Sequence, residues 1–149
     1  MRRAAAAAVV LAVAVAVVLA VGGCGDADEP AARSTSTTPS GAVELTIAYD
    51  DGAGAKTSGT LTCRGSDRRA EGALDGRAPA AELCAQARGL AEQLTTTPPK
   101  GRTCTQIYGG PETAHVTGTI DGETVDRRFR RTNGCEIADF TRAAGLLRP

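Results

Sequence analysis

Apolar and polar residues alternate along the first regular segment that follows a long polar stretch. Its apolar positions are Val43, Leu45, Ile47 and Tyr49. A period of two is typical of a strand with one buried face, and the turn residues Asp50, Asp51 and Gly52 end the pattern. We therefore predict a strand over 43–49, paired with a second strand through 60–63.

A helical spacing of apolar residues comes next, after a polar, glycine-containing loop expected over 64–78. Pro79 suits the first turn of a helix, where its missing N–H has no partner. The apolar positions on one helical face are Leu83, Ala87, Leu90 and Leu94. Because a domain this small must bury its best helix, this face is expected in the core; a docking surface for a partner helix is the alternative.

A hairpin is predicted around Asp121-Gly122, a strong two-residue turn signal. The strand before it has one face made of Ala114, Val116, Gly118 and Ile120. The return strand, 123–131, has Val125 and Phe129 on one face, and Asn133-Gly134 predicts a further turn into Cys135. Strands joined by tight turns, together with one helix, predict an antiparallel sheet in an α+β fold.

The amino terminus has the composition of an export signal, because Arg2 and Arg3 precede an entirely apolar run over 4–21. Hydropathy alone leaves a membrane anchor open. Val21-Gly22-Gly23-Cys24 resembles a bacterial lipobox, which implies a lipoprotein signal peptide over 1–23 and a diacylglyceryl group on Cys24. An odd thiol near a cleavage site is the alternative. The chain is thus expected on the outer face of the cell membrane, or outside the cell if released.

Residues 24–41 predict a flexible tether that begins at the acylated cysteine. The segment is rich in Ser, Thr, Pro and Gly and has no apolar periodicity to bury. Glycosylation of its Ser and Thr residues is the alternative to a plain solvated spacer. The folded domain is then expected over 42–149.

Four cysteines remain in this domain: Cys63, Cys84, Cys104 and Cys135. An even number of cysteines in an exported chain predicts two disulfides. Four cysteines can pair in three ways, and the sequence alone does not determine which pairing forms. A zinc site would need closely spaced ligands and usually histidines, whereas these cysteines are far apart and His115 is the single histidine. We therefore expect no metal and no cofactor.

Composition limits both the core and the partners. The chain has 2 Tyr, 2 Phe and no Trp, so its core is thin and the disulfides are expected to be needed for stability. Its 17 Lys and Arg residues balance 17 Asp and Glu residues. With no net charge, no global field would attract nucleic acid or anionic lipid.

The sequence does not favour an enzyme, because it has neither a G-x-S-x-G turn nor a phosphate-binding glycine loop. His115 is expected to be an exposed strand residue rather than a general base, since no partner nucleophile is suggested. A local basic cluster consists of Arg127, Arg128, Arg130 and Arg131. Strand alternation divides it between two faces, which favours solvated charge over an anion site.

Several ordered elements carry a family resemblance. They are Leu61-Thr62-Cys63, Gly76-Arg77-Ala78-Pro79, the segment Cys104-Thr105-Gln106-Ile107-Tyr108-Gly109-Gly110-Pro111, Val116-x-Gly118, Gly122-x-x-Val125, Phe129 and Asn133-Gly134-Cys135. Together with the cysteine spacings, they resemble the subtilisin inhibitor family of secreted bacterial proteins over roughly 43–140. The resemblance implies a five-stranded antiparallel sheet with two helices, usually as a homodimer. It also pairs Cys63 with Cys84 and Cys104 with Cys135.

The same resemblance implies inhibition of subtilisin-like serine proteases. The reactive bond would be Gln106-Ile107, with Gln106 in the primary specificity pocket of the protease. The flanking contacts would be Thr103, Cys104, Thr105 and Tyr108. The rival hypothesis is a cell-envelope lipoprotein that uses the fold as a non-inhibitory binding or structural module. An inhibitor predicts that 105–108 is extended and exposed, whereas a module predicts a buried Tyr108 or a loop folded back on the domain.

Overall fold

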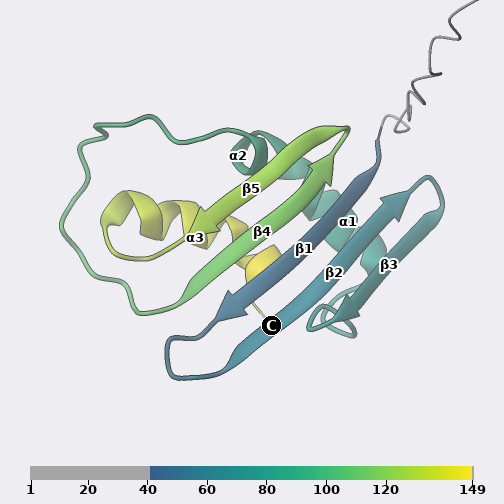
Figure 1. Cartoon of the computed structure of the whole chain (residues 1–149), viewed down its shortest axis with the longest axis horizontal. Helices are drawn as coiled ribbons and strands as arrows, with labels where there is room; N and C mark the ends of the chain where they lie inside the picture. Colours follow the sequence, from purple (N-terminus) through teal and green to yellow (C-terminus); the bar gives the residue numbers. More distant parts are fainter. Residues whose placement is uncertain (1–40, 149) are drawn as a thin grey trace, which may run out of the picture. The chain divides into compact units, whose positions relative to one another are not determined.

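The alternating segments form one antiparallel sheet of five strands (Figure 1). The computed structural model describes residues 41–148, so the predicted signal peptide, Cys24 and nearly all of the tether lie outside the described residues. The strands are β1 (Val43–Asp50), β2 (Lys56–Arg64), β3 (Asp67–Gly72), β4 (Thr113–Ile120) and β5 (Glu123–Phe129). Their order across the sheet is β3-β2-β1-β4-β5.

Three helices pack on one face of this sheet: α1 (Ala80–Gly89), α2 (Ala91–Thr95) and α3 (Gly134–Leu147) (Figure 1). The α1 helix contacts β2 and β3, α2 contacts β4 and β5, and α3 contacts β1, β5 and α1. This is the predicted α+β class. Within residues 41–148, no helix combines the length and the apolar character that crossing a membrane requires.

The number of helices differs from the two that the family resemblance implies. The single helix predicted through Leu94 is interrupted at Leu90, whose φ of −103° and ψ of 4° depart from helical values. The Leu90 N–H donates to the carbonyls of both Gln86 and Ala87, so the last turn tightens and α1 ends. Gly89, just before this point, adds backbone freedom that weakens the helix.

The core lies between the helices and the inner face of the sheet. The apolar stripe predicted for the helix faces it, because Leu83, Ala87 and Leu94 are each at most 2% exposed. This confirms the core interpretation over a docking surface. The two buried phenylalanines, Phe129 and Phe140, come from β5 and α3 and are the largest fully buried side chains.

Two elements depart from the hydrophobic pattern. The β3 strand lies inside the segment predicted as a loop; all its residues are exposed except Ala70, and pairing with β2 holds it. The predicted turn at Asn133-Gly134 is instead the start of α3. The Asn133 side chain caps this helix by accepting a hydrogen bond from the Glu136 N–H at 3.0 Å.

Candidate functional site

A long connection between α2 and β4, residues 96–112, carries the predicted reactive bond. We call it the α2–β4 loop. Figure 1 shows it projecting beyond the sheet as a wide arc between these two elements. From Arg102 to Gly110 it contains no helix, strand or turn. Backbone N–H and C=O groups along this stretch are therefore free of the regular pairing that would block a partner strand.

The centre of the loop presents apolar side chains to solvent. Ile107 is 57% exposed and Tyr108 is 65% exposed, and they are the two large apolar residues exposed in the described part of the chain. Thr105 and Gln106 are exposed as well. Adjacent apolar side chains left in water indicate a contact surface.

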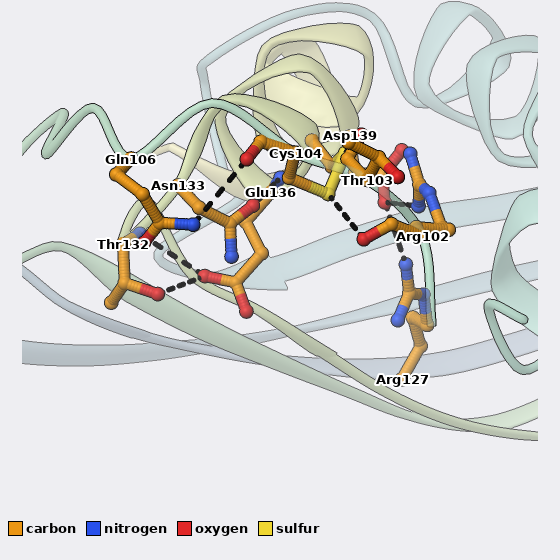
Figure 2. The surroundings of a disulfide bond; sticks show 10 residues. Arg102, Thr103, Cys104, Gln106, Arg127, Thr132, Asn133, Glu136 and Asp139 are labelled. Atoms are coloured by element: carbon orange, nitrogen blue, oxygen red, sulfur yellow. Dashed lines mark hydrogen bonds and ion pairs between the residues drawn. A yellow bond between two sulfur atoms is a disulfide. The ribbon is translucent and has the colours of Figure 1, made fainter. Parts of the chain in front are cut away.

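The amino-terminal end of this exposed stretch is attached to the first turn of α3 (Figure 2). Cys104 is disulfide-bonded to Cys135, with a Cα–Cα distance of 5.5 Å. One residue further, the Gly134 N–H donates to the Thr105 carbonyl at 2.9 Å. A Cβ on Gly134 would lie 2.1 Å from Thr105 Oγ1, so a larger residue here would require the Thr105 side chain to move.

The carboxyl-terminal end is attached to the segment that follows β5. The Gly109 N–H donates to the Arg131 carbonyl at 2.8 Å. The Arg131 guanidinium in turn donates to Glu112 Oε1 at 2.6 Å, just before β4. A Cβ on Gly109 would lie 2.7 Å from Ile137 Cγ1, so this backbone packs directly on α3. Three residues, 106–108, therefore bridge two fixed points.

The three bridging residues make little contact with the domain. The described side-chain hydrogen bond in this stretch is local, from Gln106 Nε2 to the Cys104 carbonyl at 3.3 Å. The loop is thus exposed rather than folded back, which is the arrangement that an inhibitor predicts. A buried Tyr108, which the binding module predicts, does not fit this exposure.

The structure contains the disulfide pairing that the resemblance implies. Besides Cys104–Cys135, Cys63 on β2 is bonded to Cys84 on α1. Both sulfurs of this second pair lie in the core, since Cys63 and Cys84 are each 0% exposed. Two disulfides that use all four cysteines of the described domain are consistent with an oxidising, exported location.

The predicted basic cluster divides between the two faces of the sheet as expected. Two of its four arginines, however, are partly buried instead of solvated. Arg127 and Arg131 alternate with Val125 and Phe129 on the inner face, and their side chains are 14% and 20% exposed. Arg127 pairs with Asp139 at 3.2 Å and Arg131 pairs with Glu112. A charged side chain near the core needs an oppositely charged partner, and the Asp139 and Glu112 carboxylates are those partners.

His115 is less exposed than predicted. Its side chain is 30% exposed, and Nε2 lies 2.6 Å from Asp126 Oδ1 on the neighbouring strand β5. This hydrogen bond lowers the pKa of the Asp126 carboxyl. The pair joins two strands on the outer face of the sheet, and no described hydrogen bond links it to the exposed stretch of the α2–β4 loop.

Several residues that hold the loop are not predicted from the sequence: Glu112, Arg131, Gly134 and Ile137. One local signal could have located them. Asn133 and Glu136 have the spacing of a capping box, and the Thr132 N–H also donates to the Glu136 carboxylate at 3.1 Å. A helix starting at Gly134 would have aligned its first turn with the Cys104–Cys135 disulfide.

Comparison with protein-family models and with curated proteins finds no match to this chain. The subtilisin inhibitor resemblance therefore stands as a prediction from the residues quoted above, and the loop geometry is the independent observation beside it.

The ion pair at the carboxyl-terminal end of the loop predicts a pH dependence. A backbone N–H and the Arg131 guanidinium lower the pKa of Glu112 from its ordinary value of 4.5. A lowered carboxyl pKa contributes stability above pH 4.5, and that contribution is lost as pH falls through the folded-state value below it. We expect Glu112→Gln to lower Tm by about 2–5 °C at neutral pH, with the difference shrinking as the pH falls below 4.5. Thermal unfolding between pH 3 and pH 7 measures this, and a constant difference would contradict it.

Proposed function

We propose that this protein inhibits a subtilisin-like serine protease by inserting the α2–β4 loop into the active-site cleft. The observation that carries the proposal is the exposed bridge of residues 106–108 between two attached ends. The Cys104–Cys135 disulfide and the Gly134–Thr105 hydrogen bond hold one end, and the Gly109–Arg131 hydrogen bond holds the other. An extended segment with free backbone groups can add as a strand to a protease cleft.

The attachments explain how such a segment would inhibit rather than be consumed. Ordering a flexible loop costs free energy on binding, and a loop already held at both ends avoids much of that cost. If the protease attacks the Gln106 carbonyl, the amine of Ile107 stays near the acyl group, because Gly109 remains attached to Arg131. Rejoining the bond then competes effectively with release of the cleaved chain.

Gln106 defines the kind of specificity pocket that the loop would suit. Its side chain is a neutral amide, which offers no charge to an acidic pocket and no ring to an aromatic slot. Its Nε2 hydrogen bond to the Cys104 carbonyl is exposed and easily exchanged for contacts within a protease. A broad subtilisin-type pocket with polar groups at its base is the expected partner.

The lipobox resemblance adds a cellular location to the proposal. A lipid on Cys24 and the tether over 24–41 would hold the inhibitor on the outer face of the cell membrane, where it would protect the cell surface from proteolysis. This part rests on the sequence pattern alone.

Titration of the full chain, in a nonionic detergent, into subtilisin tests the proposal. Hydrolysis of a chromogenic peptide reports free protease, and Gln106→Gly is compared with Lys100→Gly, an exposed position of the same connection outside the bridge. We expect tight inhibition by the wild type and by Lys100→Gly. Gln106→Gly should raise the inhibition constant by about 100-fold, or about 2.8 kcal/mol.

Two outcomes would overturn the proposal. One is rapid cleavage of the wild-type chain at Gln106-Ile107 without inhibition, and the other is equal inhibition by the two variants. The first would favour the non-inhibitory binding module, and the second would place the inhibitory contact outside Gln106.

A further inference from the structure

Beside the loop, three guanidinium groups converge on one carboxylate of α3. Arg102 Nη1 lies 3.1 Å and Arg127 Nη2 lies 3.2 Å from Asp139 Oδ2, and Arg142 Nη1 lies 3.8 Å from Oδ1. We call these four residues the Asp139 cluster. Figure 2 shows Arg102 from the loop and Arg127 from the sheet approaching Asp139 from different directions. One negative charge cannot neutralise three positive charges, so the cluster is two charges positive.

The excess charge is partly withdrawn from water. The side chains of Arg127 and Asp139 are each 14% exposed. Among the described residues, Arg127 Nε is buried without a hydrogen-bond acceptor. A buried guanidinium donor that lacks an acceptor costs free energy, which the ion pair with Asp139 has to offset.

Two surface hollows, of about 430 Å³ and about 280 Å³, adjoin the cluster and share Arg102, Arg127 and Asp139 in their walls. Arg142 lines the first, and Arg128 and Arg130 line the second. Their other acidic residues are Glu92 and Glu136. Five arginines against three carboxylates leave the combined region two charges positive, although the whole chain has no net charge.

We propose that the Asp139 cluster binds an acidic side chain of the protein that docks on the α2–β4 loop. Planar guanidinium groups bind carboxylates with paired hydrogen bonds, and the exposed Arg102 and Arg142 can turn toward such a group while Arg127 holds Asp139. The incoming carboxylate would reduce the excess positive charge of the cluster.

The position of the cluster favours a protein partner over a phospholipid headgroup. Cys104 lines the second hollow, and Arg102 stands four residues before Gln106 in the same open segment. Four extended residues span about 13 Å, which is within the footprint of a protein that holds the loop. The inference rests on the proposed function for the identity of that protein, which would be a protease with acidic residues beside the part of its cleft that precedes the cleaved bond.

The test uses a defined probe, an acetylated and amidated tetraglutamate peptide, so that no inhibition is required. Binding to the full chain in a nonionic detergent is measured by NMR, following the Nε–H signal of Arg127, and by calorimetry. We expect Arg142→Gln to weaken peptide binding about tenfold. Asp139→Asn should strengthen binding instead, because it removes the competing carboxylate. Arg68→Gln, which removes an exposed arginine of β3, should leave binding unchanged.

Opposite effects of Arg142→Gln and Asp139→Asn, with weaker binding at higher salt, would support the cluster as the site. Equal affinity of all variants would overturn it. Tighter binding of glycerol phosphate than of the peptide, at equal salt, would also overturn it and assign the cluster to a lipid headgroup. Because the peptide assay contains no protease, these results are independent of whether the loop inhibits subtilisin.

Discussion

The double variant Cys63→Ala/Cys84→Ala is expected to lose about 5 kcal/mol of unfolding free energy. The bond closes a loop with a sequence separation of 21 residues, for which the loss of unfolded-state entropy corresponds to about 3.3 kcal/mol. Removing two sulfurs that are 0% exposed also leaves space in the core, at about 1 kcal/mol for each. The free energy of unfolding of a small domain is roughly 5–15 kcal/mol in total, so this variant should be close to unfolded at 37 °C.

The position of this disulfide explains why the effect is large. Cys63 is on β2 of the sheet and Cys84 is on α1, so the bond joins the two layers of the domain. Few large side chains share this task, since Phe129 and Phe140 are the two aromatic residues at the centre of the core. Urea unfolding followed by circular dichroism measures the loss. A transition midpoint equal to that of the wild type would contradict the prediction.

The elements that were predicted from the sequence are those whose apolar residues have one buried side. The β1 strand follows its period of two, with Val43, Leu45 and Ile47 each at most 3% exposed. The Asp121-Gly122 turn has positive φ values at both residues, as its sequence requires. In these elements, local preference and core packing lead to the same structure.

The elements that escaped prediction are held by contacts distant in sequence. The β3 strand has no apolar alternation, because it is an edge strand with both faces largely exposed, and its pairing with β2 cannot be derived from its own residues. The start of α3 was different, because Asn133 and Glu136 carried a capping signal that the adjacent glycine obscured. Gly134 lies close to the Thr105 side chain and begins the helix instead of forming a turn.

The candidate site shows the same division. The exposed residues of the loop were predicted, since a family resemblance depends on contiguous residues. The Cys104–Cys135 disulfide that holds one end of the loop was predicted from the same resemblance. The other contacts that hold the loop were not, because Arg131, Gly134 and Ile137 lie in a separate segment and meet the loop only in the folded domain. The role of Arg127 was also beyond the sequence, because its partner Asp139 lies on a helix that had not been predicted.

The second large effect is expected from Cys104→Ala/Cys135→Ala, and it concerns inhibition more than folding. This bond closes a separation of 31 residues, which corresponds to about 3.7 kcal/mol of unfolded-state entropy. Its sulfurs are outside the core, so no cavity adds to that loss. The buried Cys63–Cys84 bond remains, and the domain should still fold at 25 °C.

Without this bond, the amino-terminal end of the exposed bridge is held by the hydrogen bond from the Gly134 N–H to the Thr105 carbonyl and by the Arg102–Asp139 ion pair. Exposed ion pairs contribute about 1 kcal/mol or less, so this end of the loop would open repeatedly. The acyl group at Gln106 would then drift from the Ile107 amine, and water would complete hydrolysis. We expect cleavage by subtilisin at Gln106-Ile107 to accelerate by at least about 100-fold relative to the wild type.

Mass spectrometry of the reaction with subtilisin over time measures this acceleration, with circular dichroism in parallel to verify that the variant is folded. Glu112→Gln serves as the matched control, since it removes the ion pairs of Glu112 with Arg131 and Arg148 near the other end of the loop and should accelerate cleavage much less. If the folded disulfide variant inhibits as persistently as the wild type, rigidity at Cys104 is not the source of inhibition. The hydrogen bonds of Gly134 and Gly109 would then be sufficient to hold the cleaved ends together.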